Sequence, residues 1–278
     1  MQIYSIGVQQ VQQAQSNSTK SANKLSSGDR LHKLGTDSAG LSVSSRQKSD
    51  ARSLQMASRN IQDGLTLTDT IASALNSMKD LLVRGRELAV QASNSTYDDT
   101  QRSQMNVEFQ NLLEEFSTQA QRTEWNGISV LTSTNSDFTL QIGRDNTSSS
   151  QLTVDLSSFL STLTNISTTN GTTLNGTKTN GIATQSTAQK VMVDMDDALN
   201  NVYEKLASAG SIQKRLEHTL ENNYSKTNSS KVSASRISDA DYAVETAEMT
   251  KNQILLQSGT AAMNKVKEIA SASLSLLS

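Results

Sequence analysis

The residues of this chain that could support chemistry are few and widely separated. His32 and His218 each lack a second ligand at the spacing that a zinc site requires. Asp194, Asp196 and Asp197 cluster on one predicted helix, but they lack the glycine turn and the distal glutamate of a calcium-binding loop. We therefore interpret the histidines as isolated exposed residues and the aspartates as part of a solvated helix face.

Sequence motifs of the common enzyme classes are also missing. The chain contains no H-E-x-x-H, no phosphate-binding P-loop, no G-x-S-x-G and no G-x-G-x-x-G. It contains no cysteine, which excludes disulfide bonds and thiolate metal sites. From these observations we predict that the protein is not an enzyme and has no cofactor or metal.

Composition limits the classes of partner and the location. A formal net charge of −2 gives no electrostatic basis for binding nucleic acid. No segment approaches the roughly 20 apolar residues of a membrane span, so we expect no membrane insertion. Residues 1–25 lack the apolar core of a secretory signal peptide, and composition alone would favour a cytosolic protein.

Long helices dominate the predicted architecture. Residues 48–91 place apolar or small side chains at steps of three and four, the period of a helix that packs on other helices. A polar turn at residues 94–99 leads into a helix over residues 100–122, so these two helices should form an antiparallel hairpin. The helical period returns over residues 188–235 and, more sparsely, over residues 238–278. The chain contains no proline, which suits helices of this length.

The remaining segments are of three other kinds. Residues 1–26 are polar and glutamine-rich and would form only a marginal helix in isolation. Alternating apolar residues between about residues 127 and 156 predict a small β-hairpin region. Residues 157–187 are rich in serine, threonine, asparagine and glycine, which predicts a solvent-exposed segment. The predicted fold class is therefore mainly α: an elongated antiparallel helical bundle or coiled coil formed by both ends of the chain, with a small β-hairpin region.

Short motifs in both halves of the chain resemble those of bacterial flagellin, in order and in spacing. They are LSSGDRL at residues 25–31, DSAGL at 37–41, RELAVQ at 86–91, NG and VL within 126–131, SRI and DADY within 235–242, QIL at 253–255 and LSLL at 274–277. The resemblance covers about residues 20–156 and 190–278, and it is specific because several elements fall at fixed spacing.

The resemblance implies a domain organisation. Residues 1–45 and 238–278 would be the two halves of an inner domain in the filament core. Residues 46–156, with the β-hairpin region, and the helix over residues 188–237 would form a bundle domain outside it. Residues 157–187 would be a short variable segment on the surface.

The resemblance also implies a function. A flagellin is a structural subunit that polymerises with copies of itself into the helical flagellar filament used for motility. Its further partners would be the flagellar export chaperone and the cap and junction proteins. Flagellins leave the cell through the flagellar type III apparatus, so the implied location is the extracellular flagellum despite the missing signal peptide.

Three alternative functions are considered together with that of a filament subunit. The hook–filament junction protein shares the plan of the two chain ends. Some flagellins carry a metalloprotease in the variable region, but residues 157–187 contain no histidine, which argues strongly against that class. A role as an adhesin or receptor ligand could coexist with the structural role.

The resemblance assigns two sets of site residues. Contacts that assemble the terminal domains are expected at Leu25, Arg30, Arg236, Asp239, Asp241, Ile254, Leu255, Val266, Ile269, Leu276 and Leu277. The four charged residues of this set would make polar contacts near the passage into the terminal helices, or would remain solvated charges. Recognition by the flagellin-sensing Toll-like receptor of animal hosts is expected at Arg84, Leu88 and Glu108.

Overall fold

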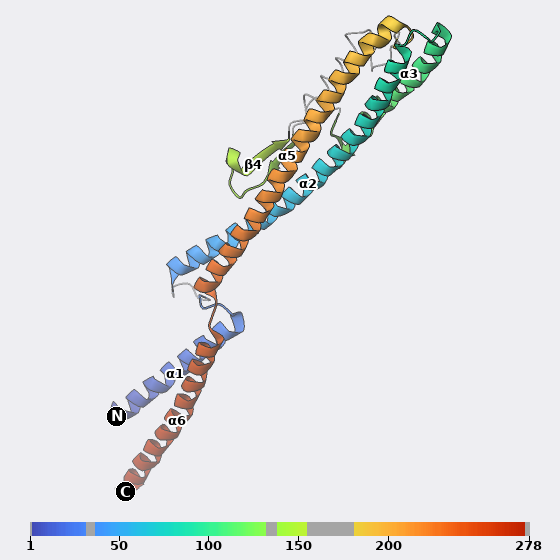
Figure 1. Cartoon of the computed structure of the whole chain (residues 1–278). Helices are drawn as coiled ribbons and strands as arrows, with labels where there is room; N and C mark the ends of the chain where they lie inside the picture. The colour runs from blue at the N-terminus through green and yellow to red at the C-terminus, as the bar shows by residue number, and fades with distance from the viewer. Residues whose placement is uncertain (1, 32–36, 132–137, 155–180, 276–278) are drawn as a thin grey trace. The chain divides into compact units, whose positions relative to one another are not determined.

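The computed structural model describes residues 2–31, 37–131, 138–154 and 181–275, which hold five α-helices and two pairs of short strands (Figure 1). The helices are α1 (Gln2–Ser27), α2 (Ser38–Ala92), α3 (Asp99–Arg122), α5 (Gln185–Ser238) and α6 (Tyr242–Ser275). This architecture confirms the mainly α prediction.

Helix α2 begins earlier than the apolar period predicted, at Ser38 instead of residue 48. The reason is a polar cap: the carboxylate of Asp37 accepts a 2.8 Å hydrogen bond from the backbone N–H of Gly40. Helix α3 begins with a full capping box, in which Asp98 and Gln101 each accept a hydrogen bond from the other's backbone N–H.

Packing divides the chain into two compact units. Unit 1 consists of residues 1–52 and 227–278, and unit 2 consists of residues 53–226. The boundaries fall inside α2 and α5, whereas the resemblance places its domain borders at 45/46 and 237/238.

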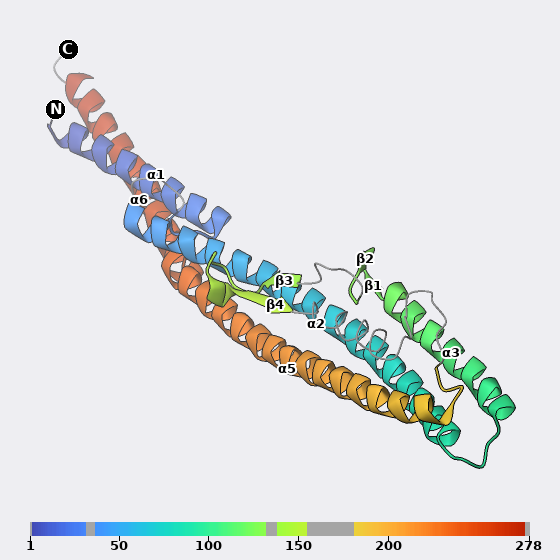
Figure 2. The ribbon, with the colours of Figure 1, turned by 90° about the horizontal axis from the view of Figure 1, so that it is seen from above.

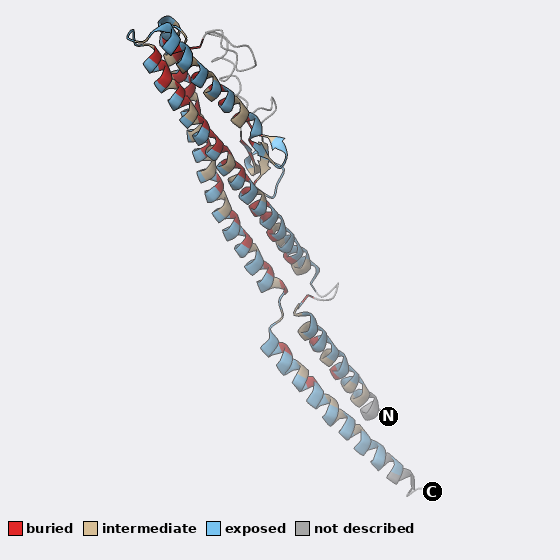
Figure 3. Ribbon diagram, turned by 90° about the vertical axis from the view of Figure 1, so that its right-hand side faces the viewer, coloured by how far each residue is buried: buried red, intermediate tan, exposed pale blue. Residues whose placement is uncertain are grey.

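The main core of unit 2 lies between α2, α3 and α5, which run alongside one another (Figures 1 and 2). From α2 it receives Leu75 and Met78, which are fully buried, and from α3 it receives Phe109 and Phe116. Buried residues follow the facing sides of these helices (Figure 3). The three–four period predicts this buried face because such residues share one side of a helix.

A tight β-hairpin follows α3. Strands β1 (Glu124–Trp125) and β2 (Ile128–Ser129) pair antiparallel, and Asn126 and Gly127 form the turn between them. Both turn residues have positive φ, 51° and 76°. A two-residue turn of this kind favours Asn-Gly because these residues adopt the left-handed conformation at the lowest cost.

A second hairpin packs on the helices of unit 2. Strand β3 (Phe138–Gln141) pairs antiparallel with β4 (Gln151–Val154), which follows the 3-10 turn η1 (Ser148–Ser150). Leu140 of β3 is partly buried, and Leu152, which lies opposite it on β4, is buried. This hairpin confirms the predicted β region.

Three helix residues hold the second hairpin in place. Gly64 of α2 leaves room for Leu140, because a Cβ at Gly64 would lie 2.4 Å from Leu140 Cδ1. Asn60 Nδ2 of α2 donates to the carbonyl of Gln141 at 3.2 Å. Asn223 Nδ2 of α5 donates to the carbonyl of Ile142 at 2.8 Å.

In unit 1, α1 and α6 pack side by side and antiparallel (Figures 1 and 2). At one end Lys24 and Glu245 form an ion pair with a 2.6 Å Nζ–Oε1 distance. Further along, Val11 approaches Gly259 so closely that a Cβ there would lie 2.7 Å from Val11 Cγ2. The helices therefore meet through small and polar side chains.

This contact has the spacing of a coiled coil. The buried and half-buried residues of α6 between residues 243 and 269 are Glu245, Met249, Asn252, Leu256, Gly259 and Met263. Those of α1 include Gly7, Val11, Ala14, Ser18, Ser21 and Leu25. We call these two rows the α1–α6 seam. Its large apolar side chains, Met249, Leu256, Met263, Val11 and Leu25, alternate with small and polar ones.

The prediction that residues 157–187 face solvent as one segment is wrong at its end. Residues 157–180 lie outside the described residues, but Gly181 and Ile182 are buried and α5 already begins at Gln185. The Ile182 side chain belongs to the main core of unit 2, and its backbone N–H donates to Asn106 Oδ1 of α3 at 2.9 Å. Within the described ranges, no helix is both long and apolar enough to span a membrane.

Candidate interaction surfaces

Large apolar side chains of α6 lie outside the α1–α6 seam. Ile254 is 60% exposed and Ile269 is 65% exposed, and Leu255 and Val266 are exposed as well. We call these four residues the α6 apolar stripe. Exposed apolar rows of this kind mark surfaces that another protein chain can cover. Two further predicted contacts, Leu276 and Leu277, lie outside the described residues.

The segments that leave α1 and α5 pair with each other inside unit 1. Asp29 and Asp239 form an isolated antiparallel β-bridge. The backbone N–H of Arg30 donates to the carbonyl of Ser238 at 2.6 Å, and Arg30 Nη2 donates to the carbonyl of Ile237 at 2.9 Å. Of the four charged residues that the resemblance assigns here, Arg30 and Asp239 are thus brought together.

Helix α6 is fixed to the end of α1 just beyond this bridge. The hydroxyl of Tyr242 donates to the carbonyl of Leu25 at 2.9 Å. Asp241 Oδ1 accepts from the backbone N–H of Ala243 at 2.9 Å and so caps the N-terminus of α6. Asp241 therefore has a local capping role in the single chain. The fourth charged residue, Arg236, is exposed on the last turn of α5.

Arg84 and Glu108 form an exposed ion pair between α2 and α3. Arg84 Nε and Nη2 donate to one oxygen of Glu108 at 3.0 and 2.7 Å, and Arg84 Nη1 donates to Glu87 at 3.1 Å. These bonds to Glu108 and then Glu87 raise the pKa of Arg84. Leu88 is only 1% exposed and lies in the core of unit 2. The structure brings Arg84 and Glu108 to one surface and leaves Leu88 beneath it.

The two residues after Arg84 connect α2 to the other helices. Gly85 faces the core, where an added Cβ would lie 3.3 Å from Phe109 of α3 and 3.6 Å from Met195 of α5. Arg86 pairs with Asp196 of α5, with Nη2 3.2 Å from Oδ2. This hydrogen bonding raises the pKa of Arg86 and lowers the pKa of the Asp196 carboxyl.

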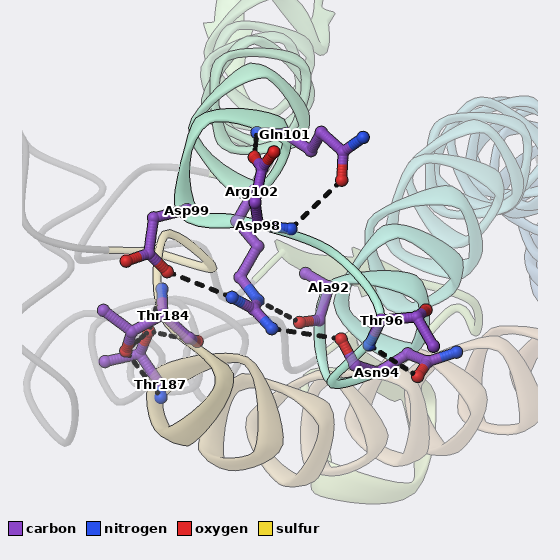
Figure 4. Close-up of polar contacts among 9 residues, drawn as sticks. All are labelled: Ala92, Asn94, Thr96, Asp98, Asp99, Gln101, Arg102, Thr184 and Thr187. Atoms are coloured by element: carbon purple, nitrogen blue, oxygen red, sulfur yellow. Dashed lines mark hydrogen bonds and ion pairs between the residues drawn. The ribbon is translucent and has the colours of Figure 1, made fainter.

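Arg102 is a buried charged residue that the sequence analysis missed. Its side chain is 8% exposed and crosses from α3 to the end of α2 (Figure 4). Nε donates to the carbonyl of Ala92 at 2.9 Å, Nη2 to the carbonyl of Asn94 at 3.1 Å, and Nη1 to Asp99 at 3.0 Å. A cation near the N-terminus of a helix opposes the helix dipole, and this was the available signal that Arg102 has partners elsewhere.

The residues first considered for chemistry do not assemble into a site. His218 and Asp197 are exposed, and Asp196 is paired with Arg86. In the part of the chain that the structure describes, no group of three or more His, Asp or Glu side chains could hold a metal ion. His32 lies outside that part.

Sequence comparisons give the family. The family model described as "bacterial flagellin N-terminal helical region" matches residues 2–136. The model described as "bacterial flagellin C-terminal helical region" matches residues 192–277. A flagellin of Halalkalibacterium halodurans is 34% identical over 261 residues, which cover 93% of this chain and 91% of that protein. The chain belongs to the bacterial flagellin family.

Other flagellins are similar over nearly the same length. Flagellin FlaB2 of Treponema pallidum is 32% identical over 266 residues, covering 93% of this chain and 91% of that protein. The flagellar filament 33 kDa core protein of Treponema phagedenis is 32% identical with the same coverage. A crystal structure of Bacillus cereus flagellin is 30% identical, with a TM-score of 0.49 over 59% of this chain and 88% of that one.

This flagellin is therefore a structural subunit of the bacterial flagellar filament, as the motifs predicted. No finding favours the hook–filament junction alternative. The two family matches leave residues 137–191 between them, which include the whole predicted variable segment, residues 157–187.

Proposed function

We propose that this flagellin polymerises by covering the α6 apolar stripe with terminal helices of neighbouring copies. The observation that carries the proposal is the division of α6 into two faces. The seam toward α1 holds Glu245, Asn252 and Gly259, whereas Ile254 and Ile269 remain exposed. Burying a large aliphatic side chain contributes about 1.5–3 kcal/mol, so covering the four stripe residues offers apolar free energy that the α1 contact leaves unused.

This division suits a subunit that must not polymerise prematurely. An α1–α6 pair whose seam mixes apolar with small and polar side chains has limited stability of its own, because isolated helices depend on tertiary burial. Neighbouring copies that bind only the ordered pair would stabilise it by mass action. Ordering of the termini and growth of the filament are then one coupled process.

A seeded polymerisation assay tests the proposal. Leu255→Ser and Ile269→Ser remove apolar area from the stripe without touching the seam. We expect either variant to slow elongation on filament seeds and the double variant to abolish it, while unit 2 unfolds at the wild-type urea concentration. Asn264→Ser, an exposed polar neighbour on α6, is the matched control. Normal elongation by the double variant would refute the role of the stripe.

We propose that the remaining relations of this flagellin follow the family pattern. The subunit is exported by the flagellar type III apparatus with an export chaperone, and it meets cap and junction proteins at the ends of an extracellular filament. It acts as a structural protein without enzymatic activity, nucleic-acid binding or membrane insertion. The support is the family membership together with the match of both terminal regions.

We propose a second role, in recognition by the flagellin-sensing Toll-like receptor of animal hosts. The supporting observation is the Arg84–Glu108 pair, whose side chains are both 49% exposed on the surface of unit 2. Charged groups in fixed mutual geometry are suited to specific recognition. The buried Leu88 would act only by supporting α2 from the core.

Receptor-reporter cells test this second role. Arg84→Ala and Glu108→Ala monomers should lose about tenfold or more in potency, since a desolvated charge contact at an interface contributes more than about 1.4 kcal/mol. Lys214→Ala, which removes an exposed paired cation elsewhere in unit 2, is the control. Equal potency of wild type and the Arg84→Ala/Glu108→Ala double variant would exclude the assignment.

A further inference from the structure

We propose that Arg102 is a positioning residue that fixes α3 axially against α2 and so presents Arg84 and Glu108 as one unit. The inference rests on the proposed receptor role for its functional meaning. Its physical part, the fixed register of α2 and α3, stands on the geometry alone.

The first step is the number of bonds that Arg102 makes to the end of α2. The last carbonyls of a helix have no partner within the helix. Here the carbonyl of Ala92, the last residue of α2, and that of Asn94 in the turn after it accept from two different nitrogens of one guanidinium, at 2.9 and 3.1 Å (Figure 4). Because the guanidinium is planar and its donors are fixed relative to each other, it binds the two carbonyls in one mutual geometry and ties α3 to them.

The bonds of Arg102 to the two carbonyls hold α3 more strongly than its ion pair with Asp99 does. The side chain of Asp99 is 90% exposed, and exposed ion pairs contribute little to stability. The guanidinium of Arg102 is instead buried, so loss of its carbonyl partners would leave a desolvated charge. Asp99 can therefore be removed as a control while the carbonyl bonds remain.

The contact of Arg102 affects the Arg84–Glu108 pair because both residues lie further along the same two helices. Glu108 lies about 9 Å from Arg102 along α3, and Arg84 lies about 12 Å from Ala92 along α2, at ~1.5 Å per residue. A slip of one residue would rotate Glu108 by about 100° and move it away from Arg84. The packing of Phe109 in the core of unit 2 opposes such a slip as well, and Arg102 adds directional bonds at the end of the helix pair.

The experiment measures the position of α3 directly. The chain has no cysteine, so spin labels at Val83→Cys and Val107→Cys, both exposed positions, report the α2–α3 distance by double electron–electron resonance in the full chain. We expect Asp99→Ala to leave the distance distribution unchanged. Arg102→Lys, which keeps the charge and stem but not the planar donors, should shift or broaden it, because a slip of α3 moves and rotates the labelled position. Arg102→Met should do the same.

Reporter potency separates the physical inference from the receptor proposal. Arg102→Lys should lower potency about fivefold, whereas Asp99→Ala should match the wild type. If Arg84→Ala itself keeps full potency, the receptor role fails and the distance measurement alone decides the role of Arg102. A wild-type distance distribution in both Arg102 variants would overturn the inference. Retained helicity by circular dichroism confirms that a changed distribution arises in folded protein.

Discussion

Replacing Asn223 by alanine tests how the β3–β4 hairpin is held on the helices of unit 2. Asn223 is 4% exposed, and its Nδ2 donates to the carbonyl of the buried residue Ile142 at 2.8 Å. Removing the donor leaves a buried acceptor unsatisfied, which costs about 1–3 kcal/mol. The higher helix propensity of alanine offsets up to about 0.7 kcal/mol. We expect a net loss of about 1–2 kcal/mol.

Urea unfolding followed by Trp125, the single tryptophan and a residue of unit 2, measures this loss. With a slope of about 2 kcal/mol per M urea, the midpoint should fall by about 0.5–1 M. Asn222→Ala is a closely matched control, since it makes the same substitution at an exposed position of the same helix. Its midpoint should equal or slightly exceed that of the wild type. If the two variants unfold at the same urea concentration, the bond to Ile142 does not stabilise unit 2.

Three further changes probe other contacts by unfolding. Thr227 Oγ1 is buried without a hydrogen-bond partner among the described residues, so Thr227→Val should raise stability by about 1 kcal/mol, and a loss would contradict this. Because pairing with Arg86 lowers the pKa of the Asp196 carboxyl, the pairing stabilises the fold at pH values above the ordinary pKa of 3.8. The difference in melting temperature between wild type and Asp196→Asn should therefore vanish as the pH falls below 3.8 and through the lowered pKa. A difference that stays constant with pH would contradict this. A glycine–serine linker in place of residues 157–180 should leave the urea midpoint of unit 2 unchanged. Ile182→Ser should instead lower the free energy of unfolding by about 2–5 kcal/mol, because Ile182 is buried. Equal midpoints for the two variants would contradict the core position of Ile182.

The helices were predictable because their signals are local. Ile61, Leu75 and Met78 of α2 are all 0% exposed, as expected from their steps of three and four. The turn at Asn126 and Gly127 was predictable for the same reason, because its conformation depends on two adjacent residue types.

The interaction surfaces were less predictable because they depend on distant partners. Leu88 is four residues from Arg84, which suggested a shared exposed face, but α2 packs against both α3 and α5 and buries a wider arc than one seam. Ile182 is the one large apolar residue between Asn175 and Thr187, where the average composition conceals it. Arg102 binds backbone carbonyls, which every residue has and which no sequence pattern marks.

The distribution of apolar side chains explains why this flagellin is both a folded protein and a polymer subunit. Unit 2 buries Phe109 and Phe116 within its own core, and each such side chain contributes about 1.5–3 kcal/mol to folding without any partner. Helix α6 instead places Glu245 and Asn252 in its seam and exposes Ile254 and Ile269. Covering those two side chains requires another molecule, so their contribution depends on subunit concentration. On the proposed assembly, folding alone therefore sets the stability of unit 2, whereas subunit contacts add to that of the α1–α6 pair.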